Sequence, residues 1–524
     1  MVNLTPTPIN KAENSLFFST SNLKSKARPS TKGRGRKKRK KKMFGDGEFS
    51  STTPHVVVLP YPSQGHINPL LQFAKRLASK GVKATLVTTV YTLSSISPLK
   101  NVAVEPISDG FDEGGFSQAG SEDVFLASFK SNGSKSLARL IEAHQNTAFP
   151  VTCVVYDAFF PWALDVAKKY GLYGGAFFTN SATVCAIFCC VSHGLISLPL
   201  QPEDIGSALP KMPKFKADDL PSFLNKTESY PAYLAMKIDQ FSNLDQADWA
   251  FCNSFEDLEI EEIKSVMDKW PAKLIGPVVP SSYLDGRIEG DIGYGASLWK
   301  PLSKECKDWL QTKPAKSVVY ISFGSMVSIT AEQMEELAWG LKESGFPFLW
   351  VIRQSQLSTL PKWFKEETSK GDKGMIVTWC NQLEILAHKA TACFVTHCGW
   401  NSTLEGLSLG VPMVGVPQWS DQLPDAKFIE DVWGVGVRAK ENEKGVVTRE
   451  EVLRCLTDVT QGNRSKEIRE NASKWRELAK KAVSHGGSSD QHINEFIQRL
   501  QHAKAQAKAS ALVGNGRIEN LYTN

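Results

Sequence analysis

One stretch of 44 residues, Trp379–Gln422, constrains the fold of this chain more than any other. Two short apolar runs within it, Ala392–Thr396 and Pro412–Val416, have the length and composition of buried strands. Helical segments are expected over Gln382–His388 and from about Thr403 onward. Strands that alternate with helices in this way are typical of a parallel, doubly wound sheet.

Small and polar residues stand where the strand Ala392–Thr396 leads into the next helix. The first turn of a helix has unpaired N–H groups and partial positive charge, so it attracts phosphate. Gly399, Asn401 and Ser402 would let a phosphate approach closely and would add donors. One turn later, the Glu405 carboxylate could accept from two ribose hydroxyls. The stretch therefore predicts a nucleotide site, in which the ring of Trp379 could lie against a base.

Asp421 and Gln422 end the stretch, and they offer an acceptor and an amide that could bind the hydroxyls of a sugar. The whole stretch resembles the signature box of the plant family 1 UDP-glycosyltransferases (secondary-product glycosyltransferases), which has the same length. The alternative is an ordinary α/β half-domain in which Gly and Pro mark turns. The residues that match the box are Trp379, Gln382, His388, His397, Gly399, Ser402, Glu405, Gly410, Pro412, Pro417 and Gln422.

The resemblance implies a GT-B fold, in which two doubly wound, Rossmann-like domains face each other across an interdomain cleft. It implies a UDP-sugar as donor substrate and a small molecule as acceptor, with no cofactor and no metal, because no Asp-x-Asp is present and the helix end takes the metal's place. Gln422 in the last position implies UDP-glucose. The donor-binding residues that the resemblance implies are Thr179, Ser325, Trp379, Cys380, Gln382, His397, Trp400, Asn401, Ser402, Glu405, Asp421 and Gln422.

A catalytic base is expected in the first half of the chain. His66 follows the apolar run His55–Pro60 and opens a helical segment, and Asp157 directly follows the apolar run Val151–Tyr156. Both side chains are therefore expected at the same sheet edge, where a carboxylate could fix the imidazole tautomer and stabilise the imidazolium. The family has a His and an Asp in these roles at matching positions. The structural alternatives are a helix cap or a satisfied polar group for His66, and an N-cap before Pro161 for Asp157.

Two further positions match the family less specifically. Thr179 follows the expected strand Leu172–Phe178 and matches a position near the donor sugar, although it could instead cap the next helix. Gly324 and Ser325 follow the expected strand Val318–Phe323 and could bind phosphate, although they could also form a plain turn.

Composition shifts divide the chain. Pro271–Pro301 is rich in Pro, Gly and Ser and is expected to join two α/β halves. The predicted parts are a disordered basic leader (1–53), an N-terminal acceptor-binding domain (54–270), a linker (271–300), a C-terminal UDP-sugar-binding domain (301–485), a C-terminal helix that returns to the first domain (486–503) and a disordered tail (504–524).

The leader carries the basic charge. Residues 1–43 contain 13 Lys and Arg and one acid, Glu13; since the net charge of the whole chain is +6, the remainder is acidic. The run Gly33–Lys42 could be a nuclear or nucleic-acid-binding tail, part of a plastid transit peptide, or an extension without function before Met43. The acidic body argues against nucleic acid as a partner.

Further features of the sequence argue against a membrane-spanning protein and a secreted protein. No apolar run reaches the roughly 18–20 residues of a membrane span, and no secretory signal is visible. The ten cysteines form no paired CxxC set and are expected to be reduced thiols. We therefore expect a cytoplasmic monomer, or a plastid or nuclear protein if the leader is a targeting segment.

The sequence thus predicts an inverting, UDP-glucose-dependent glucosyltransferase that acts on a small, largely apolar plant metabolite with a carboxylate, thiohydroximate or hydroxyl group. A non-catalytic UDP-sugar or metabolite binder is the alternative. The subgroup with the thiohydroximate S-glucosyltransferase is the most similar, and the stretches that carry this similarity are Pro106–Asp112, Asp157–Ala167, Asp218–Leu224 and Tyr294–Cys306.

Overall fold

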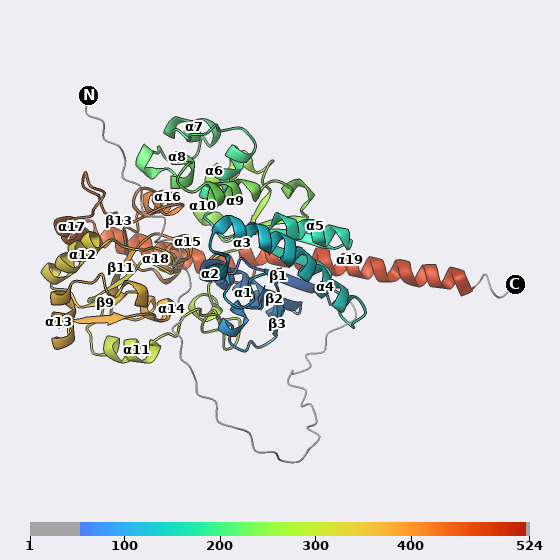
Figure 1. Ribbon diagram of the computed structural model, residues 1–524, viewed down its shortest axis with the longest axis horizontal. Coiled ribbons are helices and arrows are strands. Elements are labelled where there is room, and N and C mark those ends of the chain that lie inside the picture. The colour runs from blue at the N-terminus through green and yellow to red at the C-terminus, as the bar shows by residue number, and fades with distance from the viewer. Residues whose placement is uncertain (1–52, 520–524) are drawn as a thin grey trace, which may run out of the picture.

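The computed structural model describes residues 53–519, and its strands form two separate parallel sheets (Figure 1). Residues 1–52 of the predicted leader and 520–524 of the predicted tail lie outside the described residues. The first sheet has the order β3 (Val102–Ile107), β2 (Lys83–Thr89), β1 (His55–Leu59), β4 (Cys153–Asp157), β5 (Tyr173–Phe178), β6 (Trp249–Cys252) and β7 (Ala272–Leu274). The second sheet has the order β10 (Gly374–Val377), β9 (Phe348–Val351), β8 (Val318–Ser322), β11 (Thr391–Thr396), β12 (Met413–Gly415) and β13 (Gly436–Arg438).

Helices alternate with these strands, as the sequence pattern predicts. The helices of the first domain are α1 (Gln64–Ser79), α2 (Phe116–Ala119), α3 (Glu122–Ser128), α4 (Ser134–Gln145), α5 (Pro161–Lys169), α6 (Ala182–Ser192), α7 (Pro202–Ala208), α8 (Ser222–Asn225), α9 (Pro231–Asp239) and α10 (Glu256–Ile263). The remaining helices are α11 (Ser303–Gln311), α12 (Ala331–Ser344), α13 (Lys362–Lys370), α14 (Gln382–Leu386), α15 (Trp400–Leu409), α16 (Gln422–Lys427), α17 (Arg449–Thr460), α18 (Ser465–Val483) and α19 (Ser488–Glu519).

The first sheet is buried on both faces, because every residue of its central strand β1 is apolar or hydrogen-bonded inside the core. Val56 and Val58 pack on one face with apolar residues of α1 and α19. Val57 and Leu59 point to the other face, where they pack with apolar residues of α4 and α5. Strands covered on both faces in this way read as continuous apolar runs, which is why the sequence reveals them.

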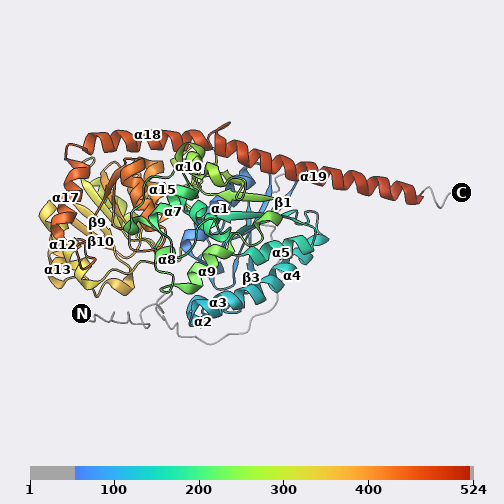
Figure 2. The same cartoon turned by 90° about the horizontal axis from the view of Figure 1, so that it is seen from above.

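The last two helices connect the domains. α18 and α19 follow one another along one side of the molecule, and α19 then projects beyond the first domain (Figure 2). Phe496 of α19 contacts Phe73 of α1 and Phe251 of β6, which secures the returning helix on the first sheet.

Three expectations about boundaries are wrong. Ala272–Leu274 pairs with β6, so the linker predicted from residue 271 begins inside the first sheet. α19 continues to Glu519, although the sequence predicts a helix end at 503 and a disordered tail. The helix of the signature box begins at Trp400, with Gly399 as its N-cap, rather than near Thr403.

Four strands that the sequence does not reveal are very short or lie at a sheet edge. β6, β7 and β13 have 4, 3 and 3 residues, too few for a pattern. β3 is an edge strand with mostly half-exposed residues and a proline, so it lacks the apolar run of the central strands.

No helix among the described residues is long and apolar enough to cross a membrane. All ten cysteines are buried and unpaired, in accord with the expectation of reduced thiols.

Asp490, near the start of α19, forms a buried ion-pair cluster. Its Oδ1 accepts from Lys80 Nζ at 2.6 Å and from Arg287 Nη2 at 2.8 Å, which joins α19 to the end of α1 and to the linker. Burial alone would raise the pKa of Asp490, but the hydrogen bonds from Lys80 and Arg287 outweigh it and hold the pKa below its usual range.

We expect Asp490→Ala to destabilise the protein by about 3 kcal/mol, because two cations lose a buried partner. Lys273→Ala is the control, since Lys273 forms an exposed pair with Glu495 on the same helix and should contribute no more than about 1 kcal/mol. The measurement is denaturant unfolding of both variants and the wild type. A carboxylate with a lowered pKa contributes stability above the unfolded pKa of about 4, so the effect of Asp490→Ala should shrink as the pH falls below that value. Equal effects of both variants would contradict the ion-pair role.

Candidate functional site

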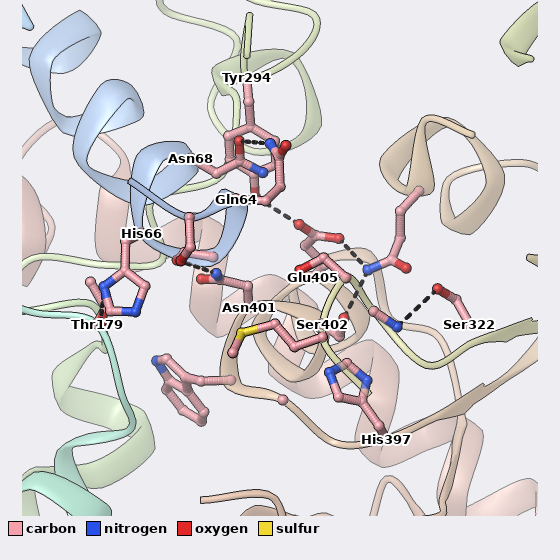
Figure 3. A pocket seen from close by; sticks show the side chains of 18 of the residues that line it. Gln64, His66, Asn68, Thr179, Tyr294, Ser322, His397, Asn401, Ser402 and Glu405 are labelled. Carbon is pink, nitrogen blue, oxygen red and sulfur yellow. Dashed lines mark hydrogen bonds between the residues drawn. The ribbon is translucent and has the colours of Figure 1, made fainter. Parts of the chain in front are cut away.

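A cavity of about 420 Å³ lies between the two domains and is lined by residues of both. Every residue proposed from the sequence as a donor-binding residue lines this cavity, and so does His66. Figure 3 shows the labelled side chains converging on it, with Gln64, His66 and Asn68 from α1 and Asn401, Ser402 and Glu405 from α15. These two helices begin shortly after the carboxyl ends of β1 and β11. This is the edge at which ligands bind in parallel α/β sheets.

His66 and Asp157 meet at the edge of the first sheet, as expected. β1 and β4 pair in parallel, so the helix after β1 and the end of β4 lie side by side. His66 Nδ1 is 2.6 Å from Asp157 Oδ2. Since a carboxylate can only accept, Nδ1 carries the proton and Nε2 remains available as a proton acceptor. The helices α1 and α5 have Ser63 and Phe160 at their N-caps, so neither His66 nor Asp157 is a helix cap.

The surroundings fix this pair. The Asp157 side chain is 1% exposed and also accepts from the backbone N–H groups of Tyr61 at 3.3 Å and Phe159 at 3.1 Å. The ring of Phe159 lies 4.7 Å from the His66 ring. Thr179 Oγ1 is 3.2 Å from His66 Nδ1 (Figure 3), and Ser181 rather than Thr179 caps α6. The carboxylate is therefore immobilised by three donors, while the imidazole faces the cleft.

A second cavity of about 80 Å³ adjoins the first and shares His66 and Phe159 with it. Its walls are largely aromatic, and the rings that line it are Tyr61, Tyr91, Phe116, Phe125, Phe159, Tyr233 and Trp299. Phe159 lines both cavities, whereas four nearby phenylalanines line neither and belong to the buried core: Phe160, Phe177, Phe178 and Phe188.

On the other side of the cleft, Glu405 is held by two neutral donors. Gln382 Nε2 donates to Glu405 Oε2 at 2.8 Å, and the Tyr294 hydroxyl donates to Oε1 at 2.9 Å (Figure 3). Gln382 also donates to Ser402 Oγ at 3.0 Å. Burial raises the pKa of Glu405 to about 7, so hydroxyl donors from a ligand would favour its ionised form. Tyr294 comes from the linker, and the sequence reasoning missed it.

His397 directly follows β11, and its ring lies between two glycines, Gly324 and Gly399. A Cβ on Gly324 would lie 2.7 Å from the imidazole, and one on Gly399 would lie 2.5 Å from it. Burial lowers the pKa of His397 to about 4, so the ring is neutral at pH 7. It can therefore donate an N–H to a phosphate as a neutral ring. Ser325 lies beside it on the cavity wall, with its carbonyl held by Arg353.

Two residues of the box turn their side chains to the first domain. Trp400 Nε1 donates to the carbonyl of Asn253 at 2.7 Å, and Asn401 Nδ2 donates to the carbonyl of Gly65 at 2.6 Å. Both residues still line the cavity, in the first turn of α15. Their side chains fix the distance between the domains, which leaves backbone N–H groups of that turn as the groups available to an anion.

The side chains at the C-terminal end of the box also form hydrogen bonds within the protein. Gln422 Oε1 accepts the backbone N–H groups of Gln418 at 3.0 Å and Trp419 at 3.3 Å, so only its NH₂ group remains for a ligand. Asp421 Oδ2 accepts from Asn180 Nδ2 at 2.7 Å, a cleft residue that the sequence reasoning missed.

Two further box residues on the cavity wall, Trp379 and Cys380, contact aromatic side chains. Trp379 lies with its ring 4.5 Å from that of Trp299, and Cys380 Sγ is 3.6 Å from the Tyr320 hydroxyl. Among the side chains that the structure describes, no group of three or more His, Cys, Asp or Glu is arranged to hold a metal ion.

Comparisons with known proteins decide the family. A family model described as "UDP-glucoronosyl and UDP-glucosyl transferase" matches residues 237–480. UDP-glycosyltransferase 74B1 of Arabidopsis thaliana is 51% identical over 461 residues, which are 86% of this chain and 100% of that protein. The chain belongs to the plant family 1 UDP-glycosyltransferases. Flavonol 7-O-beta-glucosyltransferase UGT74F1 of Arabidopsis thaliana is another relative of this UDP-glycosyltransferase, 47% identical over 85% of the chain and 98% of the relative.

Solved structures of the same family give the fold. Os79 from O. sativa in complex with UDP has a TM-score of 0.82 and 39% identity, covering 85% of this chain and 100% of Os79. The UDP-glycosyltransferase described here thus has the GT-B fold, with two facing Rossmann-like domains. These findings establish an enzyme and do not favour the alternative of a non-catalytic binder.

We expect Gly324→Ala to weaken UDP binding about 5- to 150-fold, because the new Cβ displaces His397 and a hydrogen bond of about 1–3 kcal/mol is lost. Gly345→Ala is the control. Gly345 has nearly the same backbone angle (φ +68° against +70°) but open space around the added Cβ, so it carries the backbone strain without the clash. The measurement is the Kd for UDP by calorimetry. Equal losses in both variants would mean that backbone strain, and not His397, causes the effect.

Proposed function

We propose that this enzyme transfers glucose from UDP-glucose, with inversion, to a small and largely apolar metabolite that offers a carboxylate, thiohydroximate or hydroxyl group. The observation that carries the proposal is the 2.6 Å contact between His66 and Asp157 at the edge of the cleft, opposite the nucleotide-binding loops. A base on one side of a cleft and an anion-binding helix terminus on the other suit displacement of UDP by an incoming nucleophile.

In this mechanism the acceptor occupies the aromatic cavity next to His66. Nε2 of His66 removes the acceptor proton, a contribution of roughly 10²–10⁴-fold for a general base. Asp157 holds the ring in the required tautomer and stabilises the imidazolium that forms. The acceptor atom bonds to C1 of the sugar as the bond from C1 to the diphosphate oxygen breaks, and the electron pair leaves with UDP.

Stabilisation of the leaving group is assigned to the start of α15 and to the neutral N–H of His397. Backbone N–H groups at a helix N-terminus bind phosphate without a metal, and donors fixed in a buried site need no reorganisation during the reaction. Gln382 and Glu405 would hold the ribose, Trp379 and Cys380 would lie at the base, and Thr179, Ser325, Asp421 and Gln422 would surround the diphosphate and the sugar. We propose that no metal takes part.

Support for this class of acceptor comes from the relatives. Relatives at 43–51% identity include flavonol 7-O-beta-glucosyltransferase UGT74F1 and Mogroside I-E synthase, whose names show that related sites serve different acceptors. UDP-glucose as donor rests on Gln422. A turnover assay with UDP-glucose and a panel of phenols, acids and thiohydroximates tests the whole proposal.

We expect Gln422→His to lower kcat/KM for UDP-glucose by about 5- to 150-fold, the cost of about 1–3 kcal/mol for a lost hydrogen bond to a buried polar group. The Gln422 carbonyl oxygen already accepts two backbone N–H groups while its NH₂ faces the site, and an imidazole cannot reproduce both at the same angles. Unchanged use of UDP-glucose would show that Gln422 does not bind the sugar.

We expect His66→Ala to remove activity on hydroxyl acceptors by roughly 10²–10⁴-fold, because a phenol with a pKa near ~10 still holds its proton at pH 7. A carboxylic acid with a pKa near ~4 is already ionised, so its loss should be clearly smaller. Asp157→Asn should show the same ranking. The measurement is kcat/KM for one phenol and one acid of similar shape. Equal fractional losses on both acceptors would mean that His66 serves binding or structure and not proton removal.

A further inference from the structure

Lys237 is a buried cation in the wall of the main cavity. It belongs to α9, on the acceptor side of the cleft, and it is 5% exposed. Its Nζ lies 5.0 Å from the centroid of the Phe159 ring, and that ring is in turn 4.7 Å from the His66 ring. The ammonium group is therefore one aromatic ring away from the proposed catalytic base.

This cation has no anionic partner of its own. Its hydrogen-bond acceptor is the neutral side-chain carbonyl of Asn180, and among the described residues no ion pair joins it to a carboxylate. An ammonium group has three donors, and a buried charge is costly unless it is paired. Burial accordingly lowers the pKa of Lys237.

The carboxylates nearest to Lys237 have other partners. Asp157 accepts from His66 at 2.6 Å, and Asp421 accepts from Asn180 at 2.7 Å. Asp425 accepts from Ser181, and burial raises its pKa well above the usual range, which favours its neutral form. The thiol of Cys185 on α6 is buried as well, and no ion pair joins it to Lys237 among the described residues. None of these groups replaces a direct counter-ion.

We propose that Lys237 binds the anionic group of a substrate, and that this group is the carboxylate of an acidic acceptor. This inference rests on the proposed function and assigns its acceptor class. The position of Lys237 on the acceptor side favours the acceptor, and the Asp421 carboxylate beside the expected sugar site disfavours an acidic sugar such as a uronate. One carboxylate oxygen would accept from Lys237 while the other bonds to C1 of the sugar. The bond from C1 to UDP breaks with its electron pair, and no proton is transferred.

Two variants separate charge from hydrogen bonding. Lys237→Gln removes the charge and keeps an N–H donor that can serve Asn180, whereas Lys237→Met keeps the length of the side chain and removes both. The acceptor probes are cinnamic acid and cinnamyl alcohol, which have the same skeleton. With UDP-glucose, we expect the ratio of kcat/KM for the acid to that for the alcohol to fall roughly 10- to 150-fold in both variants, the range for a hydrogen bond to a charged group. An unchanged ratio, or a fall in Lys237→Met alone, would overturn the proposal.

A binding experiment keeps the test independent of turnover. Calorimetry of cinnamate with the UDP-saturated protein should show weaker binding in both variants by a similar factor, while their affinity for UDP shows that the fold is retained. Failure of the wild type to transfer glucose to any acceptor would defeat the proposed function, whereas cinnamate binding that does not depend on Lys237 would defeat only this inference. Efficient use of UDP-glucuronate that is lost in Lys237→Gln would place the anion on the donor and overturn the acceptor assignment.

Discussion

The proposed chemistry of this enzyme depends on the parallel pairing of β1 with β4. That pairing places the start of α1 beside the end of β4, so His66 and Asp157 meet although they are far apart in the chain. The carboxylate is almost completely buried and receives two backbone N–H groups besides the imidazole. Because those bonds come from loops fixed by the sheet, the orientation of the imidazole follows from the core and not from the cleft residues themselves.

The second constraint is the distance between the domains. Trp400 and Asn401 of the second domain donate to backbone carbonyls of the first, and Asn180 and Ser181 of the first donate to Asp421 and Asp425 of the second. These bonds lie around the cavity, so the groups that line the nucleotide site also hold the two halves together. The position of the proposed base relative to the start of α15 is therefore set by side chains of the signature box.

The sequence was sufficient for the architecture because both sheets consist mainly of strands buried on two faces, which appear as apolar runs. It also located His66, Asp157 and the box, because these residues stand at recognisable positions just after the apolar runs that form strands. The sequence could not show which groups these site residues bond to. Nothing in the sequence indicates that the side-chain carbonyl of Gln422 accepts hydrogen bonds from two backbone N–H groups. Nor does it indicate that the hydroxyl of Tyr294, in the linker, donates to Glu405. Such contacts join segments that only the folded chain brings together, and Asn180 and Lys237 belong to no short motif.

Burial decides which of these groups is charged. The same exclusion of water lowers the pKa of His397 to about 4 and raises that of Glu405 to about 7, so each group is shifted toward its neutral form. In a cleft of this kind, a charged group is stabilised where hydrogen bonds or a charged ligand compensate for its burial. In the proposed mechanism, a diphosphate would supply such compensation to the helix terminus on the donor side. On the acceptor side, Lys237 has only a neutral amide, and an anionic substrate would complete its environment.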